Sequence, residues 1–183
     1  MTEKILLTPE QLRNLLDYDA DTGLLFWKHR PLEMFKTAKS FKSWNTAFAG
    51  KEALTALTDT GYKHGDIFSK KYRAHRVIWA ISNDKWPNEL IDHINGDRSD
   101  NRLCNLREAT RTENNRNGGM RKNNTSGLKG VSWNGKVEKW RATIFVNRKQ
   151  VHLGTFDCKQ KAHEAYKKAA EKYHGDFSNS GKW

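Results

Sequence analysis

The sequence predicts an α+β protein made of two small parts, and three observations support this fold class. Residues 89–117 have the pattern of strand, loop, strand and helix, with an Asn95-Gly96 turn signal after the first strand. Residues 127–183 contain three strand candidates followed by one long helix. The stretch GGMRKNNTS at 118–126 has no apolar periodicity and is typical of a linker. We therefore expect an N-terminal part over 1–118, a linker over 119–126, and a C-terminal part over 127–183 that folds as a three-stranded antiparallel sheet packed on one helix.

Short elements are expected ahead of residue 89. Thr8 is followed by Pro9 and, three residues on, by Gln11, which predicts a capped helix start. The leucines at 12, 15 and 16 share one face of that helix. The other expectations are a short strand over 24–27, irregular structure over 30–60, a hairpin within 61–68 and an apolar helix over 74–81.

Turn and cap signals define the strand, loop, strand and helix over 89–117, which we call the frame. A second short strand is predicted over 103–107. Thr110 can cap the following helix with Glu113 at the capping-box position, and Asn117-Gly118 ends that helix. The frame therefore places Asp92 and His93 at the end of one strand, and Asn114 on the first turn of the helix.

In the C-terminal part, apolar and polar residues alternate as they do in β-strands. Strands are predicted over 131–133, 140–146 and 150–156, followed by a long helix capped by Asp157. Alternation places one set of side chains on a core face, namely Ala142, Ile144, Val146, Val151 and Leu153. The opposite face carries Arg141, Thr143, Phe145, Gln150 and His152. Because that second face is basic and polar, it serves either solubility or binding.

The charge of the chain favours a polyanionic partner. Its 183 residues carry a net charge of +12, and residues 119–183 hold 14 Lys and Arg against 5 Asp and Glu. Such a field attracts nucleic acid or an anionic membrane, although lysines also solubilise small domains. No apolar run reaches the roughly 20 residues of a membrane span, and the N-terminus lacks the blocks of a signal peptide. We expect an intracellular protein that meets DNA or RNA and has no membrane role.

Cysteine usage excludes two further classes of protein. The two cysteines, Cys104 and Cys158, are far apart and form no C-x-x-C pair. A disulfide scaffold and a Cys-rich zinc site both need more cysteines at closer spacing.

Asp92, His93 and Asn114 combine metal-binding and basic groups. Neighbouring strand residues point to opposite faces, so Asp92 and His93 can have different tasks. Carboxylate and amide oxygens are hard ligands suited to Mg²⁺, and a neutral imidazole beside such a metal can deprotonate water. Metal, base and phosphate together suffice for phosphodiester hydrolysis. An Asp-His pair alone is weak evidence, because a histidine on a strand is more often a hydrogen-bonded structural residue.

The segment IDHINGDRSDNRLCNLREATRTENNRN at 91–117 resembles the HNH homing-endonuclease family, whose nuclease domain has the ββα-metal fold. The resemblance extends more loosely upstream to YDADTGLLFWK at 18–28. It implies that Asp92 and Asn114 hold one divalent metal and that His93 is the general base. It also implies that Asn105 fixes the loop that orients His93.

Two points of this resemblance, the metal ligand on the helix and the role of His75 and Arg76, each have an alternative. An Asn at the third motif position implies Mg²⁺ or Mn²⁺ rather than zinc, with Asn115 as the competing ligand to Asn114. The family implies that His75 and Arg76 lie beside the active site, with Arg76 on phosphate. The alternative is that both belong to the polar face of a helix.

The segments SGLKGVSW, KWRATI and VHLGTFD, within 126–178, resemble the Apetala-type (ethylene-response-factor-type) DNA-binding domain. That family packs three antiparallel strands on one helix and lays the sheet in the DNA major groove. The resemblance implies DNA contacts from Lys129, Trp133, Trp140, Arg141, Thr143, Arg148, Gln150 and His152. Core packing is an equal alternative for the two tryptophans.

Together these features predict a sequence-directed endonuclease of homing type that cuts double-stranded DNA. We expect one Mg²⁺ or Mn²⁺ per active site, no structural zinc, a monomer and, if a phage encodes the protein, a place in the host cytoplasm. The main alternative is a DNA-binding regulator with an inactive nuclease-like domain. A third alternative, an RNA-processing nuclease, is disfavoured because the major groove of A-form RNA is too narrow for a sheet.

Overall fold

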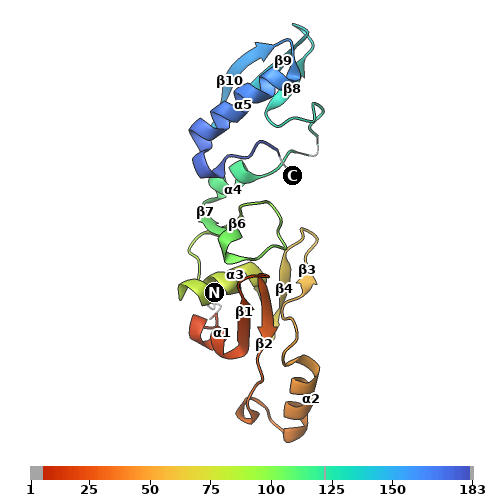
Figure 1. Ribbon diagram of the computed structural model, residues 1–183, viewed down its shortest axis with the longest axis vertical. Coiled ribbons are helices and arrows are strands. Elements are labelled where there is room, and N and C mark those ends of the chain that lie inside the picture. The colour runs from red at the N-terminus through yellow and green to blue at the C-terminus, as the bar shows by residue number, and fades with distance from the viewer. Residues whose placement is uncertain (1–5, 122, 182–183) are drawn as a thin grey trace, which may run out of the picture. The chain divides into compact units, whose positions relative to one another are not determined.

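The computed structural model describes residues 6–121 and 123–181. The chain forms two compact units, residues 1–108 and 109–183, and Figure 1 labels their helices and strands. The elements of unit 1 are α1 (Pro9–Leu15), β1 (Leu16–Asp19), β2 (Leu24–Trp27), η1 (Leu32–Met34), α2 (Ala38–Phe48), β3 (Ala56–Leu57), β4 (Lys63–Ile67), β5 (Lys70–Arg73), α3 (Ala74–Asn83), β6 (Leu90–His93), η2 (Leu103–Asn105) and β7 (Leu106–Ala109), whose last residue begins unit 2. Those of unit 2 are α4 (Arg111–Asn117), β8 (Val131–Asn134), β9 (Lys139–Val146), β10 (Lys149–Phe156), α5 (Lys159–His174) and η3 (Gly175–Phe177).

The core of unit 1 forms where α1 packs on α3 and on the strands around them. The predicted helix start is confirmed, because Thr8 accepts a hydrogen bond from the Gln11 amide and the Gln11 side chain accepts one from the Thr8 amide. The largest buried side chains of this core include Leu12, Leu15, Leu16, Leu25, Ile67, Val77 and Ile78. β1 pairs antiparallel with β2, β4 pairs with β3 and β5, and β6 pairs with β7.

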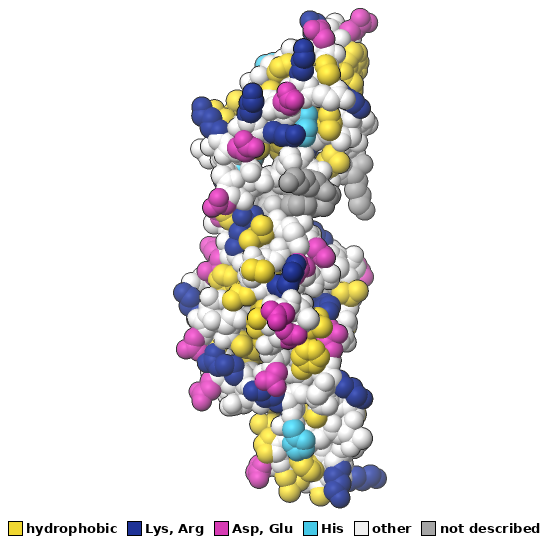
Figure 2. Space-filling view, in the orientation of Figure 1, with side chains coloured by type: hydrophobic (Ala, Val, Ile, Leu, Met, Phe, Trp, Pro, Cys, Tyr) yellow, Lys and Arg dark blue, Asp and Glu magenta, His cyan; other side chains and the backbone are white. Residues whose placement is uncertain are grey.

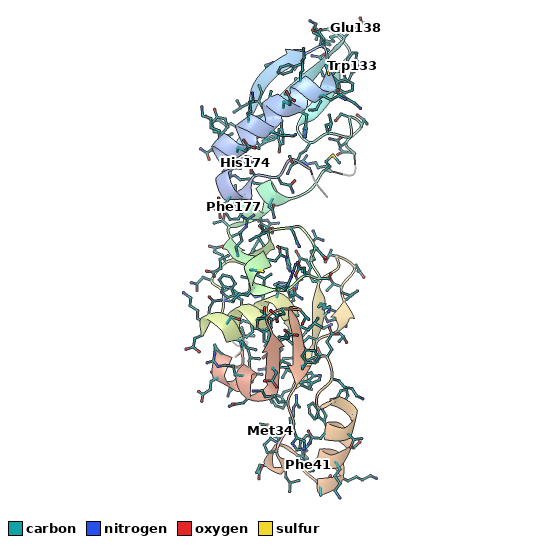
Figure 3. All side chains as sticks on the ribbon, in the orientation of Figure 1. Met34, Phe41, Trp133, Glu138, His174 and Phe177 are labelled. Carbon is teal, nitrogen blue, oxygen red and sulfur yellow. The ribbon has the colours of Figure 1, made fainter. Side chains whose placement is uncertain are left out.

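The expectation of irregular structure over 30–60 is wrong, because α2 occupies 38–48. Thr37 caps this helix through the Ser40 amide. One side of α2 packs its aromatic side chains, with Trp44 5.7 Å from Trp27 and Phe41 5.9 Å from Phe35, centroid to centroid. Figure 3 labels Phe41 on α2 and Met34 on the neighbouring η1. Helix α2 therefore packs through its own short stripe of aromatic side chains, outside the main core.

Unit 2 has the predicted three-stranded antiparallel sheet on one helix, with strand order β10-β9-β8. Ala142, Ile144 and Tyr166 are buried between the sheet and α5. Gly130 adopts a φ of 76°, and a Cβ there would meet the Tyr166 ring at 2.0 Å, so only glycine fits this contact. The predicted cap of the long helix is wrong by one residue, since Cys158, not Asp157, is the N-cap.

The division between the units lies at 108/109, ten residues before the expected end of the N-terminal part. The reason is that α4 packs with the end of the chain around η3. The expected linker is also partly built into unit 2. Ser126 is buried, and its hydroxyl donates to the Val131 carbonyl at 2.8 Å.

Candidate active site

His93 is the last residue of β6 and is almost completely buried, with 3% of its surface exposed. Its Nε2 lies 3.1 Å from the Asn101 Oδ1. Because a carboxamide oxygen only accepts, Nε2 carries the proton and Nδ1 is the basic nitrogen of this imidazole. The His93 ring also lies 5.3 Å from the His75 ring and 5.7 Å from the Tyr62 ring, centroid to centroid.

Burial keeps both of these histidines neutral. Loss of solvent lowers the pKa of His93, although the Asn101 hydrogen bond and nearby carboxylates act in the opposite direction. Burial, with the neighbouring His93, lowers the pKa of His75 to about 3. At neutral pH His93 is therefore in the form that can accept a proton.

Asp92 points away from His93, as alternation along β6 requires, and is 4% exposed. Its Oδ2 accepts a hydrogen bond from the Arg107 Nε at 2.9 Å and forms an ion pair with the Arg107 Nη2 at 2.8 Å. Arg107 lies on the paired strand β7. The pair compensates the charge of a buried carboxylate and fixes its orientation.

Asn105 holds the loop that joins β6 to β7. Its Nδ2 donates to the Asn95 Oδ1 at 3.0 Å and to the Asp100 carbonyl at 2.8 Å, and its Oδ1 accepts from the Asn95 amide at 2.9 Å. Its own carbonyl accepts from the Ile94 amide at 2.9 Å. Asn105 thus ties both ends of the loop that carries Asn101, the partner of His93.

Asn114 and Asn115 lie on α4, in unit 2, where Asn114 is half-buried and Asn115 is exposed. The Thr110–Glu113 capping box begins the helix as predicted. At the other end, the Lys129 ammonium donates to the Arg116 carbonyl at 2.9 Å and to the Gly118 carbonyl. The Asn179 side chain donates to the Asn117 carbonyl. Unit 2 therefore closes the C-terminal end of α4 with two side chains.

Two basic residues expected to contact DNA have other roles in the structure. Burial lowers the pKa of Lys129 to about 8, and its ammonium is directed at the α4 carbonyls. Arg76 donates to the Glu89 carbonyl at 3.0 Å and the Pro87 carbonyl at 3.1 Å, which holds the segment before β6. Both side chains therefore hold backbone carbonyls in the structure, and their contact with DNA stays a prediction.

The outer face of the unit 2 sheet has the expected composition. Cross-strand partners share a face, and the register pairs Gln150 with Phe145, His152 with Thr143, and Thr155 with Arg141. Arg141, Phe145, Gln150 and His152 are exposed on this face, while Ala142 and Ile144 are buried on the other. Arg148 stands at the β9–β10 turn with a φ of 64°.

The two tryptophans do not belong to that outer face. Trp133 pairs with Trp140 in a register that puts both on the side of Val131 and Ala142, the helix-packed side. Trp140 packs against the core there, and the rings lie 5.1 Å apart edge to face. Trp133, labelled in Figure 3, is half exposed. Strand alternation places both tryptophans on the face opposite Arg141, which favours the core-packing alternative, and their contact with DNA stays a prediction.

The donor chemistry of the motif fits a hard divalent cation. Asp92 offers a carboxylate oxygen, and Asn114 offers an amide oxygen. Among residues 6–121 and 123–181, no group of three or more His, Cys, Asp or Glu gathers as a metal site. Mg²⁺ in proteins commonly keeps several waters among its ligands.

Sequence reasoning missed Asn101, Arg107 and Tyr62. Asn101 is 1% exposed, and a fully buried asparagine in a loop signals a hydrogen-bonding role. In the sequence this residue is hidden among other polar loop residues, DRSDNR at 97–102. For Arg107, an available signal was its position on the strand that pairs with the strand of Asp92.

Family comparisons agree with this arrangement. One family model, HNH endonuclease, matches residues 72–116 and a second, AP2 domain, matches residues 126–176. Protein 3.8 of Escherichia phage T7 is 38% identical over 112 residues, which cover 61% of this chain and 92% of that protein. The chain belongs to the family of phage T7 protein 3.8. It thus contains an HNH endonuclease domain followed by an AP2 domain.

The two domains together indicate a DNA-binding nuclease. The family model for the HNH endonuclease covers Asp92, His93, Asn105 and Asn114, and HNH nucleases generally use a divalent metal. No solved structure matches the chain. In the part of the chain that the structure describes, none of the helices has the length and apolar character to cross a membrane.

Proposed function

We propose that the protein is an endonuclease of homing type that hydrolyses a phosphodiester of double-stranded DNA, with His93 as the general base. Asp92 and Asn114 would hold one Mg²⁺ or Mn²⁺. The AP2 domain would bring the nuclease to its target through the outer face of its sheet. The phage relative supports action inside an infected cell.

One observation carries this proposal: the buried, neutral and oriented imidazole of His93. The Asn101 oxygen accepts from Nε2, which orients the ring and makes Nδ1 the nitrogen that would take the proton. Asn105 fixes the loop that carries Asn101 through hydrogen bonds to Asn95 and Asp100. A histidine that only filled space in the core would not need its partner Asn101 to be held in this way. His93 would take a proton from the attacking water, so that the water oxygen can attack phosphorus.

A bound divalent cation would neutralise charge on the scissile phosphate. The protein's contribution is to orient the groups around it. Arg107 holds the Asp92 carboxylate through Oδ2, and the unit 2 contacts hold α4, which bears Asn114. Both proposed ligands therefore have fixed supports.

The outer face of the AP2 sheet supports duplex DNA as the partner. Arg141 can contact guanine or phosphate, and Gln150 can pair with an adenine edge. Thr143 and His152 lie between them by register. The nuclease domain has a small contact area, so specificity would come from this face.

A DNA-binding regulator without cleavage is the second candidate, and the Asp92–Arg107 pair is the observation that favours it. A guanidinium 2.8 Å from the proposed ligand oxygen already compensates its charge. Such a pair reduces the electrostatic gain from a bound cation. Activity, rather than affinity for DNA, separates the two candidates.

The deciding experiment is a nicking assay on supercoiled duplex DNA with Mg²⁺, with Mn²⁺ and with EDTA. The proposal expects metal-dependent cleavage that His93→Ala lowers by about a hundred- to ten-thousand-fold, with DNA affinity unchanged. His29→Ala, which removes an exposed imidazole outside the motif and the AP2 sheet, is the control for loss of a histidine. A wild-type protein that binds duplex and does not cut it in either metal supports the regulator.

The metal ligand on α4 is tested by a neighbouring pair of variants. Asn114→Ala should lose Mn²⁺ binding, measured by titration calorimetry, while the exposed Asn115→Ala should keep it. The reverse result would assign the metal to Asn115.

A further inference from the structure

The segment around α2 has a charge composition unlike the rest of its unit. Residues 34–51 contain four lysines, Lys36, Lys39, Lys42 and Lys51, and no Asp or Glu. Residues 1–118 as a whole are nearly balanced, with 19 Lys and Arg against 16 Asp and Glu. The family matches cover 72–116 and 126–176 and leave this segment without a role.

The helix is held rigidly to its unit by Asn45. Asn45 is 9% exposed. Its Oδ1 accepts from the Arg30 amide at 2.9 Å, and its Nδ2 donates to the Arg30 carbonyl at 2.9 Å. The Arg30 guanidinium lies 3.8 Å from the centroid of the Trp44 ring. A buried pair of hydrogen bonds and a cation–π contact fix which side of α2 faces outward.

The outward side carries Lys39, Lys42, Ser43 and Thr46, all exposed and spaced at i, i+3, i+4 and i+7. We name these four residues the α2 basic face. With Ala38 and Ala47 they line a shallow depression. Figure 2 shows Lys and Arg side chains at the outer surface of the α2 end of unit 1. Small side chains between the lysines let a phosphate chain come close to the helix, and the hydroxyls can donate to its oxygens.

We propose that the α2 basic face binds the phosphate backbone of duplex DNA, as a second contact outside the AP2 sheet. This inference rests on the proposed function, because the partner is the DNA that the nuclease cuts. DNA is favoured over a membrane surface because the face has no large apolar side chain to insert between lipids. Trp44 and Phe41 of α2 pack on another side of the helix, against Trp27 and Phe35.

The test compares two double variants of the full chain in EDTA, where cleavage cannot interfere. Lys39→Glu/Lys42→Glu changes the face, and Lys71→Glu/Lys85→Glu makes the same charge change at other exposed sites of unit 1. Affinity for a long duplex is measured between 50 and 200 mM salt. The loss of two phosphate contacts should make the slope of log affinity against log salt shallower by about 1.8. The ratio of wild-type affinity to variant affinity should therefore fall about twelve-fold between 50 and 200 mM salt.

The control double variant should keep more of the wild-type slope than the α2 variant does. Lys39→Gln/Lys42→Gln, which adds no repulsion, should give the same loss of slope, and circular dichroism checks that α2 is retained. Equal slopes for wild type and both α2 variants would overturn the second contact and leave the nuclease function standing. A wild-type chain that does not bind duplex at all would overturn both. Binding of wild type, but not of the α2 variants, to phosphatidylserine vesicles with no effect on DNA would assign the face to membranes and also overturn the proposal.

Discussion

The Nε2 of His93 and the Oδ1 of Asn101 lie 3.1 Å apart, and both residues are nearly inaccessible to solvent. This contact sets the tautomer of the imidazole. The loop between them is short, and Asn105 fixes it from both sides. Asn101 is therefore a positioning residue, which acts through His93 and not on DNA.

Replacement of Asn101 should alter the pH profile of cleavage as well as its rate. Asn101→Leu removes the acceptor, so Nε2 no longer has a fixed partner, and we expect the rate to fall by about ten- to a hundred-fold, less than loss of the base itself. Asn101→Asp keeps an acceptor and adds a negative charge, which should raise the pKa of His93 and move the acid limb of the profile to higher pH. Single-turnover rates between pH 5 and 9 measure both effects. If both variants lose rate equally with unchanged profiles, Asn101 has only a structural role.

His75 should make the stability of unit 1 depend on pH. Its folded pKa is about 3 and its ordinary value is 6.5, so the unfolded state binds more protons between these values. The free energy of unfolding therefore falls as pH is lowered from 6.5 towards 3. His75→Phe should remove up to about 1.4 kcal/mol per pH unit of this slope. Urea unfolding at several pH values measures it, with His29→Phe at an exposed site as the control. An unchanged slope in His75→Phe would contradict the burial of a neutral imidazole.

Lys129 and Asn179 should control the stability of α4. A hydrogen bond from a charged group contributes about 1.5–3 kcal/mol, so Lys129→Met should speed hydrogen exchange of the amides of Asn114 and Gly118 by about ten-fold or more. The Gly118 amide donates to the Asn114 carbonyl in the turn that Lys129 closes, and the Asn114 amide donates to the Thr110 carbonyl in the preceding turn. Lys168→Met removes the same charge from an exposed position on α5 and should leave exchange unchanged. Equal exchange in wild type and Lys129→Met would show that the helix does not depend on this lysine.

The sequence predicts those parts of the fold whose signals are local. The capping boxes at Thr8 and Thr110 and the alternation along β9 and β10 are confirmed, because cap geometry and strand period depend on a few neighbouring residues. The second strand of the frame lies three residues later than predicted, over 106–109, because a 3₁₀ turn takes up 103–105. Helix α2 was missed since its cap uses Ser40 where the usual pattern has Glu or Gln.

The candidate site shows the same limit. Asp92, His93, Asn105 and Asn114 are marked by their spacing, but their partners are set by tertiary contacts. Nothing local in the sequence distinguishes Lys129, which holds α4, from the exposed lysines of the same unit. The family resemblance implies DNA contact for the tryptophan pair, with core packing as an equal alternative, and the register places the pair on the packed side of the sheet.

The outer face of the AP2 sheet should separate affinity from base preference. Arg141 and Gln150 lie on the same face of neighbouring strands, and both are exposed. Arg141→Ala should weaken binding to all duplexes, and the salt slope should become shallower by about 0.9 if it contacts one phosphate. Gln150→Ala should cost about 1–3 kcal/mol only on the preferred sequence, because the amide reads one base edge. Lys167→Ala, on the exposed side of α5, is the matched control and should change neither quantity.

The measurement is a selection of bound duplexes from a random pool, followed by titration of the selected and a scrambled duplex at two salt concentrations. Relaxed preference at one position in Gln150→Ala, with the salt slope intact, would assign base recognition to the outer face. A uniform loss in both variants would mean that Gln150 also contacts the backbone. If Trp133→Ala relaxes base preference and Gln150→Ala does not, base recognition would come from the face of the sheet opposite Gln150. The assignment of the DNA face from the strand register would then be wrong.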